Sequence, residues 1–422
     1  LFAVVVMAFA ASPAMGQIST NTPPEKRTLP LAKEVEQEME SARFRLGPVR
    51  LAPFFTLDNV GWTNNALVTS EGMVDDYTAS VSAGAKLIVP LGRKGYLRGN
   101  VAPTYDWYYR TEALRGWGGS YNGELLGLFN RLTLGAGGGY TERISTVSSE
   151  VARDVLNTTA TGSAKAELRL LDRLSLFAGA ETARLKQTDP SASTPGLAPV
   201  SDLDRTETAY RVGVRYGFTA NLSFGIMGEE VDTRFDASAS LRDNDVRGLL
   251  FVARYDRERL YLEGTVGLRD GKPVTPNEYF PAYRELTYGY FASFFVTPPL
   301  ELQVLGHRRP EASLFLDNPY YFNTQNGLRL KLAVGRRLSL SAEGELGSNR
   351  YVNPVQEVST GNIVVRQDDT FTFGGGFDFG VSRAITVGLK VSRDRYDSNI
   401  DYYDRKLVRV YGGLAVVADF GR

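Results

Sequence analysis

Tight turns recur along most of this chain at an interval that limits the folds open to it. Turn-forming groups stand near residues 92, 130, 172, 219, 257, 298, 336 and 381, which are 38 to 47 residues apart. Each is flanked by segments of about 11 to 15 residues in which apolar and polar side chains alternate with the period of a β-strand. Longer polar stretches separate successive tight turns. The pattern predicts consecutive hairpins with short turns at one end and long loops at the other.

A repeat near 40 residues is also the period of a β-propeller blade, but a blade holds four short strands and this chain shows two long ones per repeat. Long paired strands with unequal loops are typical of outer-membrane β-barrels, whose spanning strands need about 9–11 residues. We therefore expect an all-β fold: a single transmembrane antiparallel up-and-down barrel of about 18 strands. The expected strands are 48–61, 76–89, 95–109, 117–129, 131–145, 158–171, 173–186, 205–217, 220–234, 244–256, 258–269, 284–297, 299–309, 322–335, 337–350, 367–380, 382–396 and 406–420.

The phase of the strands predicts which side chains face lipid. In the segment 337–346, Leu340 falls on an apolar face, while Ser341 and Glu343 fall on a polar one. Alternation of this kind also fits a soluble β-sandwich. Aromatic residues favour the barrel, because those in the apolar phase gather near strand ends, as the two interfacial girdles of a membrane barrel require. These are Trp107, Tyr109, Trp117, Tyr121, Tyr288 and Tyr290 on the long-loop side, and Phe129, Tyr216, Phe379 and Phe420 on the other.

Three regions are expected along the chain. Residues 1–16 are apolar and end in small residues, which is typical of a signal peptide, here N-terminally incomplete. Residues 17–47 are expected to form a periplasmic linker with a short amphipathic helix. Residues 48–422 form the outer-membrane barrel, so the protein is expected in the cell outer membrane. The even strand count returns both ends of the barrel to the tight-turn, periplasmic side.

The expected helix carries an apolar stripe. Leu31, Val35, Met39 and Ala42 recur at helical spacing, after Thr28 as a cap and Pro30 in the first turn. A solvated linker helix, a helix that docks a partner and a helix that occludes a pore all fit this pattern.

Composition excludes several function classes. Lys and Arg together number 48, as do Asp and Glu, so the chain lacks the basic balance of a nucleic-acid binder. It has no Cys, one His and neither a GxSxG nor an HExxH motif, so we expect no enzyme, no cofactor and no metal site. The spacing Asp397, Asn399 and Asp401 lacks the glycine and glutamate of a calcium loop. His307 lies in a strand and is expected in the lumen wall.

The polar phase of the strands supplies the candidate functional residues. It carries both charges in similar number, which favours a hydrophilic conduit without strong ion preference. The candidate lumen-lining residues are Arg98, Asp106, Glu124, Arg143, Glu167, Arg211, Arg215, Glu263, Glu301, His307, Lys331, Glu343, Glu345 and Lys390. Four inward tyrosines could stack on sugar rings or simply pack in the wall: Tyr96, Tyr108, Tyr261 and Tyr411.

The start of the expected barrel resembles the β-barrel porins found near exopolysaccharide and exosortase gene clusters. The resemblance rests on Leu46-Gly47-Pro48, Asp58-Asn59 and Asn64-Asn65, and on the hairpin count and the last strand. It covers about residues 44 to 420. It implies an 18-stranded barrel that passes a secreted polysaccharide and works with a periplasmic polysaccharide-export protein.

Three functions follow as hypotheses. The first is a porin-like conduit for polysaccharide export, the second a passive diffusion porin for small hydrophilic solutes, and the third a structural or adhesive surface barrel. The expected partners are outer-membrane lipid and lipopolysaccharide, the barrel assembly machinery and the periplasmic export protein, with no nucleic acid.

Overall fold

The computed structural model describes residues 31–417, apart from 43, 68–72, 147–149, 151–153, 190–198, 237–239, 316, 357–360 and 401–402. The expected signal peptide, Thr28, Pro30, Asp401 and Phe420 lie outside the described residues. The described part holds one α-helix, α1 (Leu31–Ser41), two 3-10 turns, η1 (Glu112–Leu114) and η2 (Val200–Leu203), and nineteen strands. The strands are β1 (Phe44–Leu46), β2 (Val49–Thr63), β3 (Asp76–Leu91), β4 (Gly95–Tyr108), β5 (Gly116–Leu128), β6 (Leu132–Thr146), β7 (Asp154–Leu171), β8 (Leu174–Thr188), β9 (Arg205–Gly217), β10 (Leu222–Phe235), β11 (Asn244–Arg257), β12 (Leu260–Pro273), β13 (Tyr283–Thr297), β14 (Leu300–Ala312), β15 (Tyr320–Val334), β16 (Leu338–Gln356), β17 (Ile363–Gly380), β18 (Ile385–Ser398) and β19 (Arg405–Val417).

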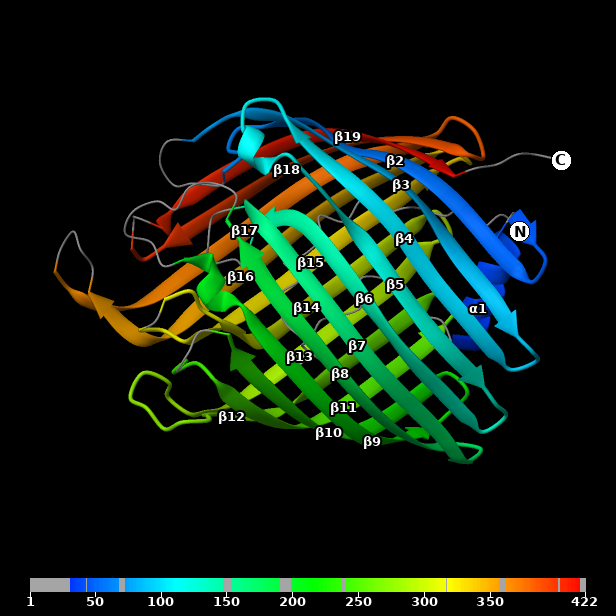
Figure 1. The fold of residues 1–422 in the computed structure, drawn as a ribbon, viewed down its shortest axis with the longest axis horizontal. Coiled ribbons are helices and arrows are strands. Elements are labelled where there is room, and N and C mark those ends of the chain that lie inside the picture. The colour runs from blue at the N-terminus through cyan, green and yellow to red at the C-terminus, as the bar shows by residue number, and fades with distance from the viewer. Residues whose placement is uncertain are drawn as a thin grey trace.

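Strands β2 to β19 form one closed antiparallel barrel. Each pairs with the next along the chain, and β19 pairs with β2 to close the ring. Each of the eighteen expected segments coincides with a strand, the last as far as Val417, where the described residues end, and the expected fold class is confirmed. Figure 1 shows the strongly tilted strands of the barrel, with the short turns gathered at one end and the long loops at the other.

Strand β1 was not expected. Gly47, at φ +61°, and Pro48 turn the chain so that Leu46 pairs with Val49 in a short hairpin. Strand β1 covers the first residues of β2, where the described pairing with β19 stops at Phe54. Three residues are too few to show an alternating pattern, so the sequence suggested only a barrel entry at this point.

The seam between β2 and β19 contains the other residues of the family resemblance. Asn59 has a φ of +52°, a left-handed conformation that asparagine tolerates, and it lies in a register shift between Asp58 and Gly61. Asn64 exchanges hydrogen bonds with the backbone of Val408, through its side-chain oxygen at 2.7 Å and its amide at 3.1 Å. These residues bend and close the barrel.

The outer face of the barrel is apolar. On β16, Leu340 and Leu346 are 40% and 61% exposed, and Phe373 of the neighbouring strand is 47% exposed. Trp117 near the start of β5 and Tyr109 just after β4 are exposed at the long-loop end, and Phe129 just after β5 is exposed at the tight-turn end. An apolar band between aromatic residues is the surface that a lipid bilayer solvates. None of the described helices is long and apolar enough to cross a membrane.

Candidate functional site

The polar face of the barrel brings the predicted lumen residues together. Directly paired residues of neighbouring strands share a face, as do residues two apart on one strand. Arg98 pairs with Glu124 and Arg211 with Glu229, and following the register from strand to strand puts all the candidates on this one face. Since the opposite face carries the apolar band, the shared face is the inner wall.

Ion pairs join the inner wall across one or more strands. On one side, Glu124 accepts from Arg98 at 2.6 Å and from Lys165 at 2.6 Å, which links β4, β5 and β7. On another side, Lys390 of β18 contacts Glu343 of β16 at 2.5 Å. Acidic and basic side chains therefore neutralise one another along the wall instead of forming a field of one sign.

A second network runs along β8 to β12. Arg211 lies between Glu181 and Glu229, at 3.0 Å from each, and Arg269 reaches Glu229 at 2.7 Å. Glu229 and Arg269 are buried, whereas Arg215 pairs with Glu167 in a more exposed position. Burial of paired charges requires close contact and further hydrogen bonds, and both are present here.

Several other candidates accept hydrogen bonds from side chains of the neighbouring strand. Ser80 donates to Asp106 at 2.6 Å, Ser293 donates to Glu301 at 2.6 Å, and Arg329 donates to Glu345 at 3.1 Å. His307 is buried, with its Nε2 at 2.8 Å from Asn323 Oδ1. Arg143 and Lys331 face inward on β6 and β15.

The four tyrosines differ in what their rings can contact. Tyr261 is 1% exposed, donates to Glu263 and packs between Phe291 and the guanidinium of Arg254, so its faces are already covered. Tyr96 packs beside the helix α1. Tyr108 and Tyr411 are half-buried in the wall. Tyr261 is therefore a wall residue and offers no open ring face to a sugar.

Helix α1 lies against the inner wall at the tight-turn end (Figure 1). Val35 is 2% exposed and forms one buried cluster with Ile88 and Leu126 of the wall, and Leu31 and Met39 pack against it. The stripe that the sequence showed is therefore buried inside the barrel. This position rules out the solvated linker helix among the three alternatives.

The tip of the β14–β15 hairpin reaches into the barrel at the long-loop end. Pairing between β13 and β14 ends at Tyr288 with Arg308, beyond which the hairpin leaves the wall. Leu314 at its tip is buried in a cluster with Val155 of β7 and Phe235 of β10. Val200 and Leu203, the first and last residues of η2, complete this cluster. The hairpin is therefore anchored on strands far from its own.

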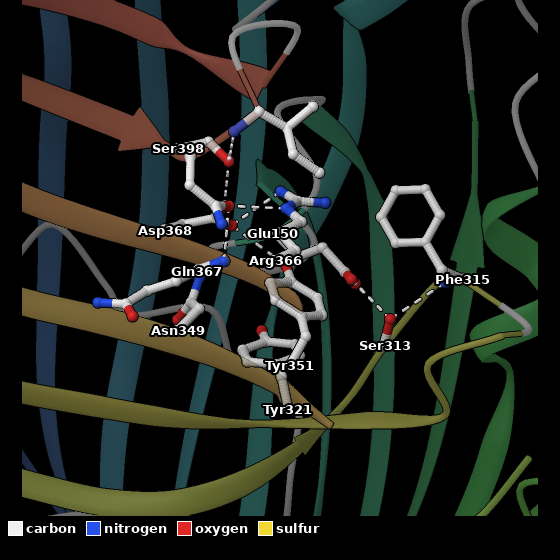
Figure 2. Close-up of polar contacts among 12 residues, drawn as sticks. Glu150, Ser313, Phe315, Tyr321, Asn349, Tyr351, Arg366, Gln367, Asp368 and Ser398 are labelled. Atoms are coloured by element: carbon white, nitrogen blue, oxygen red, sulfur yellow. Dashed lines mark hydrogen bonds and ion pairs between the residues drawn. The ribbon is translucent and has the colours of Figure 1, made fainter. Parts of the chain in front are cut away.

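Glu150 joins this tip to the opposite side of the barrel. Its carboxylate accepts a hydrogen bond from Ser313 Oγ at 2.6 Å (Figure 2). It also accepts one from the backbone amide of Leu314 at 2.8 Å. The eight strands β7 to β14, of eighteen in the ring, separate the two loops. Burial raises the pKa of Glu150, while Arg366 nearby opposes that shift. Arg242 donates to the Ser313 carbonyl at 3.0 Å, which fixes the tip from a third loop.

A buried arginine, Arg366, lies at the centre of a cluster of polar and aromatic side chains beside Glu150. Arg366 makes two hydrogen bonds of 2.8 Å to Asp368, and its guanidinium lies 3.5 Å from the ring centre of Tyr403 and 4.6 Å from that of Tyr351. Figure 2 shows this group beside Glu150, with Ser398 donating to Asp368. The long-loop end is therefore packed by side chains from several loops.

These loop residues were not among the candidates. Glu150, Ser313 and Arg366 lie in loops or at strand ends, where alternation carries no information on facing, and their contacts join residues more than 150 positions apart in the case of Glu150 and Ser313. Asp397 pairs with Arg395 at 2.8 Å, and Asn399 accepts from the Gln367 amide. Within the described ranges, no group of three His, Asp or Glu side chains is arranged to hold a metal ion.

Comparisons with known proteins bear on the fold. No family model matches the chain, and no curated protein sequence matches it. The outer membrane protein OpdK from Pseudomonas aeruginosa matches with a TM-score of 0.52 at 10% identity, over 87% of this chain and 99% of that chain. A second structure of P. aeruginosa OccK1 (OpdK) matches with a TM-score of 0.51, and one with vanillate with 0.50, each at 10% identity and the same coverage.

At this identity the likeness is one of fold. Together with the closed barrel and its apolar outer band, it defines an outer-membrane β-barrel of porin architecture.

Proposed function

We propose that this protein is a passive diffusion channel of the outer membrane for small hydrophilic solutes. The observation that carries the proposal is the inner wall: charges of both signs, paired with one another, line a barrel that is narrowed at both ends. A wall of this kind wets the lumen without trapping one sign of ion. One of the matching OpdK structures was determined with vanillate, and solutes of that small size are the ones that we propose for this channel.

Polysaccharide export fits this geometry less well. A polymer must pass the whole axis, and here α1 occupies the tight-turn end while the β14–β15 tip meets Glu150 at the other. The residues that carried the family resemblance serve to shape the entry hairpin and the seam. Contacts with lipopolysaccharide, with the assembly machinery and with an export protein stay predictions.

Adjacent residues of β16 test the proposal. The chain has no Cys, so Ser341→Cys creates a single thiol on the inner wall and Leu340→Cys a single thiol on the lipid face. In liposomes, a small water-soluble maleimide should label the Ser341→Cys protein rapidly. In a separate sample, labelling of the same thiol with a bulky maleimide should reduce the influx of small sugars.

The Leu340→Cys protein is the control and should label slowly with no change in influx. Unchanged influx after complete bulky labelling at Ser341→Cys would contradict the proposed channel.

A further inference from the structure

Helix α1 contacts the barrel through a narrow apolar stripe. Leu31, Val35 and Met39 are four residues apart and so share one face of the helix. They meet Ile88 and Leu126, which lie on the inner wall of β3 and β5. The opposite face of α1, which includes Lys33, Glu36 and Gln37, is exposed, so wall contact is limited to one side of the helix.

Among the described residues, Arg98 of the wall forms ion pairs with two residues of α1. Arg98 contacts Glu34 at 3.2 Å and Glu38 at 3.5 Å, and the two glutamates are 43% and 39% exposed. Partly exposed pairs of this kind contribute little to affinity. Arg98 also contacts Glu124 at 2.6 Å, so the wall arginine keeps an acidic partner when the helix is absent. Wall and helix are therefore each compatible with separation.

Helix α1 is not part of the closed ring of strands. Only Ala42 and residue 43 separate α1 from β1, and β1 is held to β2 by three residue pairs. The barrel ring itself is closed by β19 with β2 and does not need α1.

We propose that α1 is a releasable plug of the periplasmic mouth, which lowers flux when it is docked on Ile88 and Leu126 and raises flux when it leaves the wall. The proposal rests on the proposed channel function for its effect on flux. The docking equilibrium itself can be measured without any flux.

Bridging the helix to the wall tests the effect on flux. Val35→Cys and Ile88→Cys place two thiols in one packed cluster of a chain that has no others, and a short bis-thiosulfonate can join them. In planar bilayers the bridged protein should remain in a low-conductance state, and reduction should restore transitions to a higher one. A matched bridge between Leu340→Cys and Phe377→Cys, paired on the lipid face, should leave the conductance unchanged. Equal conductance of the bridged and reduced α1 forms would overturn the plug.

Labelling tests the docking without current. Val35→Asp puts a charge into the buried cluster, which opposes docking, whereas Gln37→Asp puts the same charge on the exposed face. With Met39→Cys as reporter, the maleimide labelling rate should rise on the order of tenfold in Val35→Asp and stay unchanged in Gln37→Asp. Equal rates in the two variants would overturn the proposal. Labelling as expected in a protein that never conducts would contradict the proposed channel and leave the docking equilibrium standing.

Discussion

Neighbouring residues of a barrel strand face opposite sides, one the lipid and the next the lumen, because side chains alternate along a strand with a period of two. Leu340 lies in the exposed apolar band, and Ser341, its neighbour, faces the inner wall between Lys331 and Gly376. The alternating pattern was sufficient to predict the facing of these positions. It could not predict that Arg98 binds α1 as well as Glu124, because that choice depends on a helix far away in the sequence.

At this scale we predict opposite tolerances for arginine. Leu340→Arg should reduce the folded yield in lipid vesicles, since a mid-bilayer arginine on the lipid face costs about 2–4 kcal/mol. Ser341→Arg adds a cation to a polar wall and should fold with nearly the wild-type yield. A folded barrel and the heat-denatured chain differ in electrophoretic mobility, and this difference measures the folded yield of each variant. Equal yields of the two variants would contradict the assignment of faces.

Local sequence patterns predict the strands and the helix of this protein, but not the position of every element inside the barrel. Strands β2 to β19 follow from local alternation and turns, and α1 follows from its apolar stripe. The inward course of the β14–β15 tip does not, because it depends on Leu314 packing with Val155 and Phe235 and on Glu150, all remote in sequence. Local patterns define an element, whereas its position inside a barrel depends on long-range packing.

The hairpin tip can be tested as an element. Leu314→Asp puts a charge into a buried cluster and should release the tip, while strand pairing keeps the barrel folded. Single-channel conductance should rise, and larger sugars should enter liposomes. Val274→Asp makes a similar change at an exposed loop position and should alter neither. A Leu314→Asp channel with wild-type conductance would show that the tip does not limit flow.

Helix α1 should respond to pH. Burial against the wall raises the pKa of Glu38, with Arg98 and Lys86 opposing the shift and Glu34 and Glu124 adding to it. Because the pKa of Glu38 is higher in the docked state than in the released state, the docked state binds a proton more readily. Docking therefore becomes more favourable as the pH falls, and this gain is lost as the pH rises through the raised pKa. The Met39→Cys labelling rate should therefore fall on mild acidification, and Glu38→Gln should flatten this dependence. A rate that rises on acidification would contradict the sign.

The whole molecule is close to electrically neutral, with 48 basic and 48 acidic residues, and its inner wall mixes both signs. Ion selectivity follows the sign that dominates a pore. We therefore predict a reversal potential near zero under a gradient of potassium chloride. A potential close to that of a perfectly cation- or anion-selective membrane would show that one set of wall charges, such as Arg211 and Arg215, governs the pathway.

Permeation by solutes of graded size tests the central claim most directly. Purified protein in liposomes, exposed to an isosmotic series from monosaccharides to large dextrans, gives an influx rate for each solute. A passive diffusion channel narrowed by α1 and the β14–β15 tip predicts rapid entry of monosaccharides, a steep fall with size, rates proportional to concentration, and exclusion of the polymers. Impermeability to every small solute, or entry of long polysaccharide at rates like those of the small sugars, would contradict it.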